Sequence, residues 1–135
     1  MVSLDLISAA AAALRPHRVG DRMFGDVAAV LETSTGQRHA GVCIDTPCGT
    51  GFCAEHAAIA AMVTAGEYRI ARIVAVWRDE RDRLVVLPPC GRCRQFIRQI
   101  DPANLDTEVV LGLDHTAILR DLIPSWEWPP ALPGR

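Results

Sequence analysis

The chain contains no lysine, and all 14 of its basic residues are arginines. With 16 acidic residues the formal net charge is only −2. A protein that binds nucleic acid through the phosphate backbone usually carries a pronounced excess of basic residues. The charge balance therefore argues against nucleic acid as the main partner. A bias in codon usage explains the absence of lysine better than a role in phosphate binding does.

Long apolar runs are also missing. A membrane-spanning helix needs about 20 consecutive apolar residues, and the longest candidate is the alanine-rich stretch 6–14, directly behind Asp5. A secretory signal peptide would have a basic segment before such a stretch, and none is present. We therefore expect a cytoplasmic protein without membrane association, whose first helix lies here.

The composition is that of a folded domain. Of the 135 residues 50% are hydrophobic and 22% are charged, and no internal repeat is present. We expect one domain over 1–135, with a proline-rich tail at 126–135. Apolar patterning, with proline and glycine at the boundaries, predicts helices at 3–14, 53–65, 90–100 and 117–123, and strands at 26–32, 37–44, 70–77, 84–87 and 108–113. This order predicts the α/β class, as a three-layer α/β/α sandwich around a mixed five-stranded sheet.

Five cysteines gather between residues 43 and 93. An odd number without a secretion signal favours a thiolate metal site over a disulfide framework. Cys90 and Cys93 lie three residues apart at the start of a predicted helix, so both sulfurs can reach one ion. A third thiolate from Cys53 would leave a tetrahedral zinc one position for water, as catalytic zinc requires. Helix N-termini at these positions favour the thiolate form.

Glu55 follows the first of these cysteines by two residues, which would place its carboxylate beside the metal without binding it. Zinc lowers the pKa of its water to about 7. A neighbouring carboxylate can take that proton and deliver it to a leaving nitrogen, and such general acid–base catalysis contributes about 10²–10⁴-fold. The cysteines and Glu55 together predict a hydrolytic zinc enzyme.

Two short motifs carry a family resemblance: Cys-Ala-Glu at 53–55, and Pro-Cys-Gly-Arg-Cys at 89–93. They match the zinc deaminase pattern with cysteine in place of its first histidine. The longer segments 52–59 and 87–95, and Leu-Ile-Pro at 122–124, are similar to those of the cytidine deaminase superfamily. The chain resembles in particular the small homo-oligomeric cytidine and blasticidin-S deaminases, over almost its whole length.

This resemblance implies a cytidine-deaminase-like fold and a role for each matching residue. The three cysteines would hold one Zn²⁺ per chain, and Glu55 would carry protons while a cytosine-type ring loses ammonia. The peptide groups around Ala54 and Pro89 would contact the base, and Phe24 would flank it. The implied partners are a small-molecule substrate and further copies of the chain, in a homotetramer or homodimer, and the implied role is pyrimidine salvage.

The chain departs from the family just before the zinc helix. The family usually has Asn-x-Glu there, whose side chains bind ribose hydroxyls, whereas this chain has Cys43 and Asp45. Asp45 can still accept a hydrogen bond, or could merely cap a turn, but Cys43 cannot replace an amide because a thiol is a weak donor and acceptor. The glycine-containing loop 46–51 is similar to that of blasticidin-S deaminases. A nucleoside antibiotic such as blasticidin S is therefore an alternative substrate.

Other interpretations of these residues stay open. Cys48 could be the fourth ligand of a closed four-cysteine site, which would make the chain a non-catalytic zinc-stabilised binding module. Cys90 and Cys93 could instead form a disulfide, and Phe24 could belong to the core.

Three thiolates leave a zinc site with net negative charge, so hydrogen-bond donors near sulfur would keep the zinc electrophilic. His56, Arg92 and Arg94 are candidates for this role, and plain packing or exposure is the alternative for His56. Trp126 and Trp128, in the tail, could contact a neighbouring subunit, a ligand or the protein's own surface.

Overall fold

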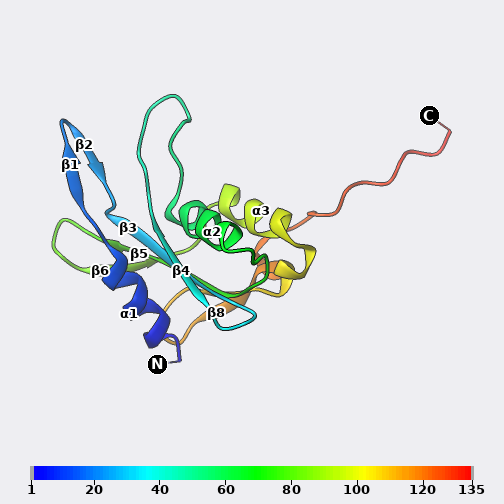
Figure 1. The fold of residues 1–135 in the computed structure, drawn as a ribbon. Helices are drawn as coiled ribbons and strands as arrows, with labels where there is room; N and C mark the ends of the chain where they lie inside the picture. Colours follow the sequence, from blue (N-terminus) through cyan, green and yellow to red (C-terminus); the bar gives the residue numbers. More distant parts are fainter. Residues whose placement is uncertain (1, 135) are drawn as a thin grey trace.

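A mixed β-sheet with helices on both faces forms the centre of the protein, which a computed structural model describes over residues 2–134 (Figure 1). The elements are, in chain order, α1 (Leu4–Ala13), β1 (His17–Val19), β2 (Arg22–Phe24), β3 (Val27–Thr33), β4 (Arg38–Val42), α2 (Ala54–Thr64), β5 (Ile70–Arg78), β6 (Leu84–Leu87), α3 (Gly91–Ile100), the 3₁₀ helix η1 (Pro102–Asp106), β7 (Glu108–Val110), β8 (Thr116–Ile118) and the 3₁₀ helix η2 (Leu119–Leu122). The sheet order is β4-β3-β5-β7-β8, with β6 also paired to β5, and β5 and β7 form its parallel pair.

The alternation of side chains along the central strands produces three layers. In β3, Ala28 and Val30 belong to the apolar cluster that includes the buried residues of α1, whereas Ala29 and Leu31 belong to the cluster around α2 and α3. The neighbouring strand β5 divides its side chains in the same way. The predicted three-layer α/β/α sandwich is therefore confirmed.

The end of the chain differs from the sequence-based expectation. The helix predicted over 117–123 is wrong, because this segment begins in strand β8 and continues as the short 3₁₀ helix η2. Strand β8 pairs antiparallel with β7, and the Leu119 N–H donates to the Thr107 carbonyl at 2.9 Å. This added strand makes the sheet six-stranded rather than five-stranded. Pairing with β7 outweighs the weak helical tendency of residues 117–123, a segment of only seven residues that is followed by Pro124.

A small hairpin, β1–β2, was not expected either. Its two three-residue strands pair only with each other, and their residues are exposed or half-buried. The turn between them contains Gly20 at φ +60°, a left-handed conformation that glycine adopts without steric cost. Strands this short and exposed lack the apolar alternation on which strand prediction depends.

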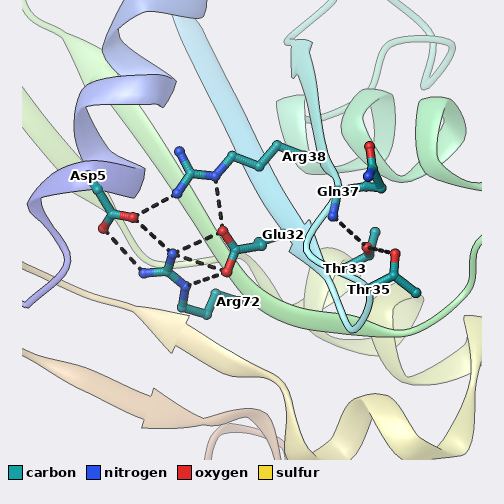
Figure 2. A network of polar contacts seen from close by, with 7 residues as sticks. All are labelled: Asp5, Glu32, Thr33, Thr35, Gln37, Arg38 and Arg72. Carbon is teal, nitrogen blue, oxygen red and sulfur yellow. Dashed lines mark hydrogen bonds and ion pairs between the residues drawn. The ribbon is translucent and has the colours of Figure 1, made fainter.

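Four charged side chains connect α1 to the sheet (Figure 2). Arg72 of β5 donates to Asp5 of α1 at 3.1 Å and to Glu32 of β3 at 3.2 Å. Arg38 of β4 donates to the same carboxylates, at 2.7 Å to Asp5 and 3.0 Å to Glu32. Hydrogen bonds from Arg72 are the main reason why the pKa values of Asp5 and Glu32 lie below their ordinary range. The network ties three strands and α1 together on the face away from α2.

Gly41 of β4 lies against the backbone of α2. A Cβ atom at this position would lie 2.4 Å from the Ala58 nitrogen and 2.5 Å from the Ala57 Cβ. Gly41→Ala should therefore push α2 off the sheet and lower the free energy of unfolding by about 1–3 kcal/mol. Urea denaturation measures the change. Gly112→Ala is the control, because its added Cβ would make only an ordinary 3.6 Å contact with His115, and an equal loss in both variants would contradict the steric explanation.

The tail over 126–134 is irregular, as predicted, and extends away from the body of the protein (Figure 1); Arg135 lies outside the described residues. Trp126 packs on the protein's own surface, with the guanidinium carbons of Arg98 and Arg120 at 5.6 and 6.0 Å from its ring centroid. Trp128 is 90% exposed.

Among the described helices, none is long and apolar enough to cross a membrane.

Candidate active site

Two helix N-termini bring three cysteines together. Cys53 is the N-cap residue of α2 and Cys90 that of α3, and both have extended backbone conformations. Cys93 lies in the first turn of α3 and is fully buried. The Cys90 sulfur is 3.7 Å from that of Cys53 and 3.6 Å from that of Cys93. The three predicted ligands thus form one compact group of sulfur atoms.

The spacing of these sulfurs fits zinc. With Zn–S bonds of about 2.3 Å, a tetrahedral zinc holds its sulfur ligands about 3.8 Å apart. A disulfide would need about 2.05 Å, and all five cysteines are free. Among the described residues, no other cysteine, histidine or carboxylate joins this group, and Cys48 lies exposed in the loop outside it. A closed four-cysteine site and a Cys90–Cys93 disulfide are therefore both unsupported.

The chemistry of the donor set also fits a cation. Burial is the main reason why the pKa values of the Cys53 and Cys93 thiols are raised, and in Cys93 the nearby Glu55 carboxylate adds to the effect. Burial opposes ionisation of Cys90 too, but the N–H groups of the first turn of α3 and the neighbouring thiols outweigh it and lower the pKa. A divalent cation bound by these sulfurs would stabilise their thiolate forms, and its binding would therefore release the thiol protons.

Glu55 is buried beside the sulfurs, with 6% of its surface exposed. Burial raises the pKa of its carboxyl group, and hydrogen bonds from its own backbone and from Cys93 offset part of this rise. The side chain lines a cavity of about 610 Å³ that also reaches Cys53 and Cys90. The remaining wall of this cavity is formed by Arg22, Asp26, Val27, Cys43, Ile44, Asp45, Thr46, Pro47, Gly49, Gly51, Phe52, Ala54, Ala75, Leu87, Pro88 and Arg92.

The three predicted sulfur-donor candidates take different positions. His56 stacks on Phe96, with ring centroids 4.3 Å apart, and its Nδ1 lies 3.5 Å from the Cys93 sulfur. Arg92 lines the cavity and donates to the Gly51 carbonyl at 3.4 Å. The Arg94 guanidinium contacts backbone carbonyls instead of a sulfur. Of the three, the structure places His56 in contact with a sulfur of the group, that of Cys93.

Arg94 connects the second cysteine segment to the end of the fold. Its guanidinium donates to the carbonyls of Pro89 and Leu122, at 2.8 Å each. Pro89 directly precedes the Cys90 cap, and Leu122 ends η2. Arg94 therefore holds the backbone before Cys90 against the C-terminal segment, a structural contact rather than one to sulfur.

The predicted substrate contacts divide into two groups. Cys43, Asp45 and Ala54 line the cavity. Pro89 is buried and is not part of the cavity wall, although its neighbour Pro88 is. Phe24, half-buried in β2, is not part of the cavity wall.

Asp26 is a wall residue that sequence reasoning missed. It precedes β3, and its Oδ1 accepts a hydrogen bond from the Cys43 thiol at 3.3 Å. Asp26 has no motif partner nearby in the chain, since the pairing of β3 with β4 brings it to Cys43. Its charge at the start of a predicted apolar strand was the one available signal.

The family comparison agrees with this geometry. The family model of the cytidine and deoxycytidylate deaminase zinc-binding region matches residues 4–109. The chain belongs to this family. The match spans α1 to β7 and includes all three cysteines and Glu55, so the predicted resemblance to the cytidine deaminase superfamily is confirmed. No curated protein sequence matches the chain.

Solved structures of cytidine deaminases have the same fold as this chain. The enzyme from Burkholderia pseudomallei is 28% identical, with 93% of this chain and 98% of that chain covered and a TM-score of 0.72. The enzyme from Mycobacterium tuberculosis is 27% identical, with 93% of each chain covered and a TM-score of 0.66. The Mycobacterium leprae enzyme, 21% identical over 92% of this chain and 95% of its own, has a TM-score of 0.66 and supports the fold alone.

Proposed function

We propose that the protein is a zinc-dependent hydrolase that replaces the exocyclic amine of a cytosine-type ring by a carbonyl oxygen and releases ammonia. One observation carries the proposal: the buried carboxylate of Glu55 lines the same cavity as Cys53 and Cys90, two members of the cysteine group. A zinc site that only stabilises a fold is normally closed by four protein ligands. Three sulfurs beside a carboxylate and an open cavity favour catalysis over the alternative of a zinc-stabilised binding module.

The chain's own residues would bind one zinc ion through Cys53, Cys90 and Cys93. When bound, zinc supplies Lewis-acid activation of water for attack on the amino-bearing ring carbon. Glu55 would accept the proton that the water loses and deliver it to the leaving nitrogen. One C–O bond forms and one C–N bond breaks, so that water and the amine give a carbonyl and ammonia.

The cavity wall suggests how a ring would be held. Leu87 and Phe52 offer apolar surface to a ring, and both line the cavity. We propose that the peptide groups around Ala54 and Pro89 contact its polar edge, since Ala54 begins α2 and lies in the wall. A contact between Phe24 and the base stays a prediction.

Ammonia release from the zinc-loaded protein tests the proposal. A panel of cytosine, cytidine, deoxycytidine and substituted cytosines, followed by a coupled ammonia assay, should give turnover with at least one compound. Zinc content is measured on the same sample. One zinc per chain with no ammonia from any compound would contradict the proposal and favour the binding module.

We further propose that the protein assembles as a homotetramer. The apolar side chains of Trp128 and Leu132, 90% and 69% exposed, support this assembly because a contact between copies would remove their apolar surface from water. Light scattering after size-exclusion chromatography should give about four times the 14.7 kDa chain mass. A monomer at micromolar concentration would contradict this assembly.

A further inference from the structure

The backbone that leads into Cys90 has few hydrogen-bond donors. Strand β6 ends at Leu87, and the next two residues, Pro88 and Pro89, have no backbone N–H group. Cys90 follows directly as the N-cap residue of α3, and its sulfur belongs to the group of three. The place of this sulfur therefore depends on what holds the backbone at Pro89.

The side chain of Arg94 in α3 holds this backbone. Its Nε donates to the Pro89 carbonyl and a terminal nitrogen donates to the Leu122 carbonyl, at 2.8 Å each. The Arg94 backbone N–H also donates to the Cys90 carbonyl, at 3.0 Å. Hydrogen bonds from a guanidinium are charge-assisted, and its planar shape fixes the directions of its donors. One residue thus holds the backbone on both sides of the bond between Pro89 and Cys90.

The second carbonyl belongs to a segment that is anchored in the core. Leu122 ends η2, and Leu119 of the same short helix is fully buried in the apolar cluster that also contains Ile97 of α3. Leu122 itself packs against this cluster. Its carbonyl is therefore a fixed point, and Arg94 connects the backbone before Cys90 to it.

Cys90 needs such an anchor more than Cys93 does. Cys93 is fully buried, so packing on all sides fixes its sulfur, whereas Cys90 is exposed. The groups of a binding site have to be held within about 0.5 Å of the productive geometry by the contacts around them. A shift of the backbone at Pro89 would move the Cys90 sulfur relative to the other two.

We propose that Arg94 is a positioning residue for the metal site. By holding the Pro89 carbonyl against that of Leu122, it keeps the Cys90 sulfur at the distance from the other two sulfurs that one zinc ion requires. The inference rests on the zinc site of the proposed function and adds the C-terminal segment to the parts of the fold that maintain it. Arg94 acts through the backbone, since its guanidinium contacts carbonyls and not a sulfur.

Zinc affinity tests this inference when apoprotein and a chelator of known affinity compete for Zn²⁺. Arg94→Met should raise the zinc Kd by about 10- to 100-fold, as for other groups that orient metal ligands. Arg98→Met is the matched control, because Arg98 also connects α3 to the C-terminal segment, with its guanidinium carbon 5.6 Å from the Trp126 ring centroid. Its zinc Kd should stay within about threefold of the wild-type value.

A lysine variant separates positioning from charge. Arg94→Lys keeps the positive charge, but its donors lie on one nitrogen and cannot reproduce the fork of the guanidinium. Its zinc affinity should therefore stay about tenfold below that of the wild type.

Cobalt reports on the sulfurs themselves. Thiolates also bind Co²⁺, and the thiolate-to-metal charge-transfer absorption depends on how the sulfurs are arranged. At saturating Co²⁺ this absorption should shift or weaken in Arg94→Met and stay unchanged in Arg98→Met. Circular dichroism checks that each variant is folded.

Three results would overturn the inference: wild-type zinc affinity in Arg94→Met, an equal loss in Arg98→Met, or full recovery in Arg94→Lys. The proposed function fails in a different way. Zinc binding that depends on Arg94, without ammonia release from any cytosine compound, would retain the positioning role and contradict the deaminase. Ammonia release by an Arg94→Met protein with wild-type zinc affinity would retain the deaminase and overturn the positioning role.

Discussion

Replacing Glu55 by glutamine should lower kcat/KM for the best cytosine compound by about 10²–10⁴-fold, the usual contribution of a general acid–base residue. Glutamine nearly matches glutamate in shape, but its amide cannot accept a proton from water and return it to the leaving nitrogen. Because burial already disfavours the charged form of Glu55, the neutral amide should leave the free energy of unfolding unchanged or slightly higher.

Two further measurements separate proton transfer from metal binding. Elemental analysis should find the same zinc content in Glu55→Gln as in the wild type, because the Glu55 carboxylate does not belong to the group of three sulfurs proposed to bind the ion. The matched control is Glu127→Gln, an exposed glutamate of the tail, which should keep full activity. A Glu55→Gln protein that holds zinc and stays within about threefold of wild-type activity would exclude Glu55 as the proton carrier.

The parts of the fold that sequence predicts best are those whose signals are local. The cysteines at 53, 90 and 93 sit at helix starts, where spacing alone places two sulfurs on one face, and the structure has both helices within one residue of their expected starts. The central strands also carry their own signal, a short continuous apolar run such as Ala28 to Leu31, which is typical of a strand buried on both faces. Such patterns need no knowledge of what packs against them.

The parts that were missed depend on contacts between distant segments. Strand β8 exists because β7 offers it a partner, and its three residues have too little pattern to separate strand from helix. The partner of Cys43 could not be predicted either, since Asp26 lies 17 residues away in the chain. The partners of Arg94, one of the three candidate donors to sulfur, also lie outside its local sequence, since one of its two backbone carbonyls belongs to Leu122.

Replacing Cys93 by alanine should remove zinc and activity together. Mutations of outer residues around a metal typically cost about 10–100-fold in affinity, so loss of a direct, fully buried ligand should cost at least about 100-fold. After dialysis, Cys93→Ala should contain no zinc and release no ammonia. Cys48→Ala is the control, because Cys48 is exposed and lies outside the sulfur group, and it should retain both.

Thermal unfolding distinguishes loss of the metal from damage to the fold. An ion that binds only the folded state stabilises it by RT ln(1 + [L]/Kd), about 2.7 kcal/mol when free zinc is a hundred times Kd. Added zinc should therefore raise the Tm of wild-type and Cys48→Ala apoprotein but leave that of Cys93→Ala unchanged. If Cys93→Ala unfolds at the wild-type apoprotein temperature, its fold is intact and the missing shift reports the lost ligand. A zinc-dependent shift of wild-type size in Cys93→Ala would show that the ion binds elsewhere, and the three-sulfur site would be wrong.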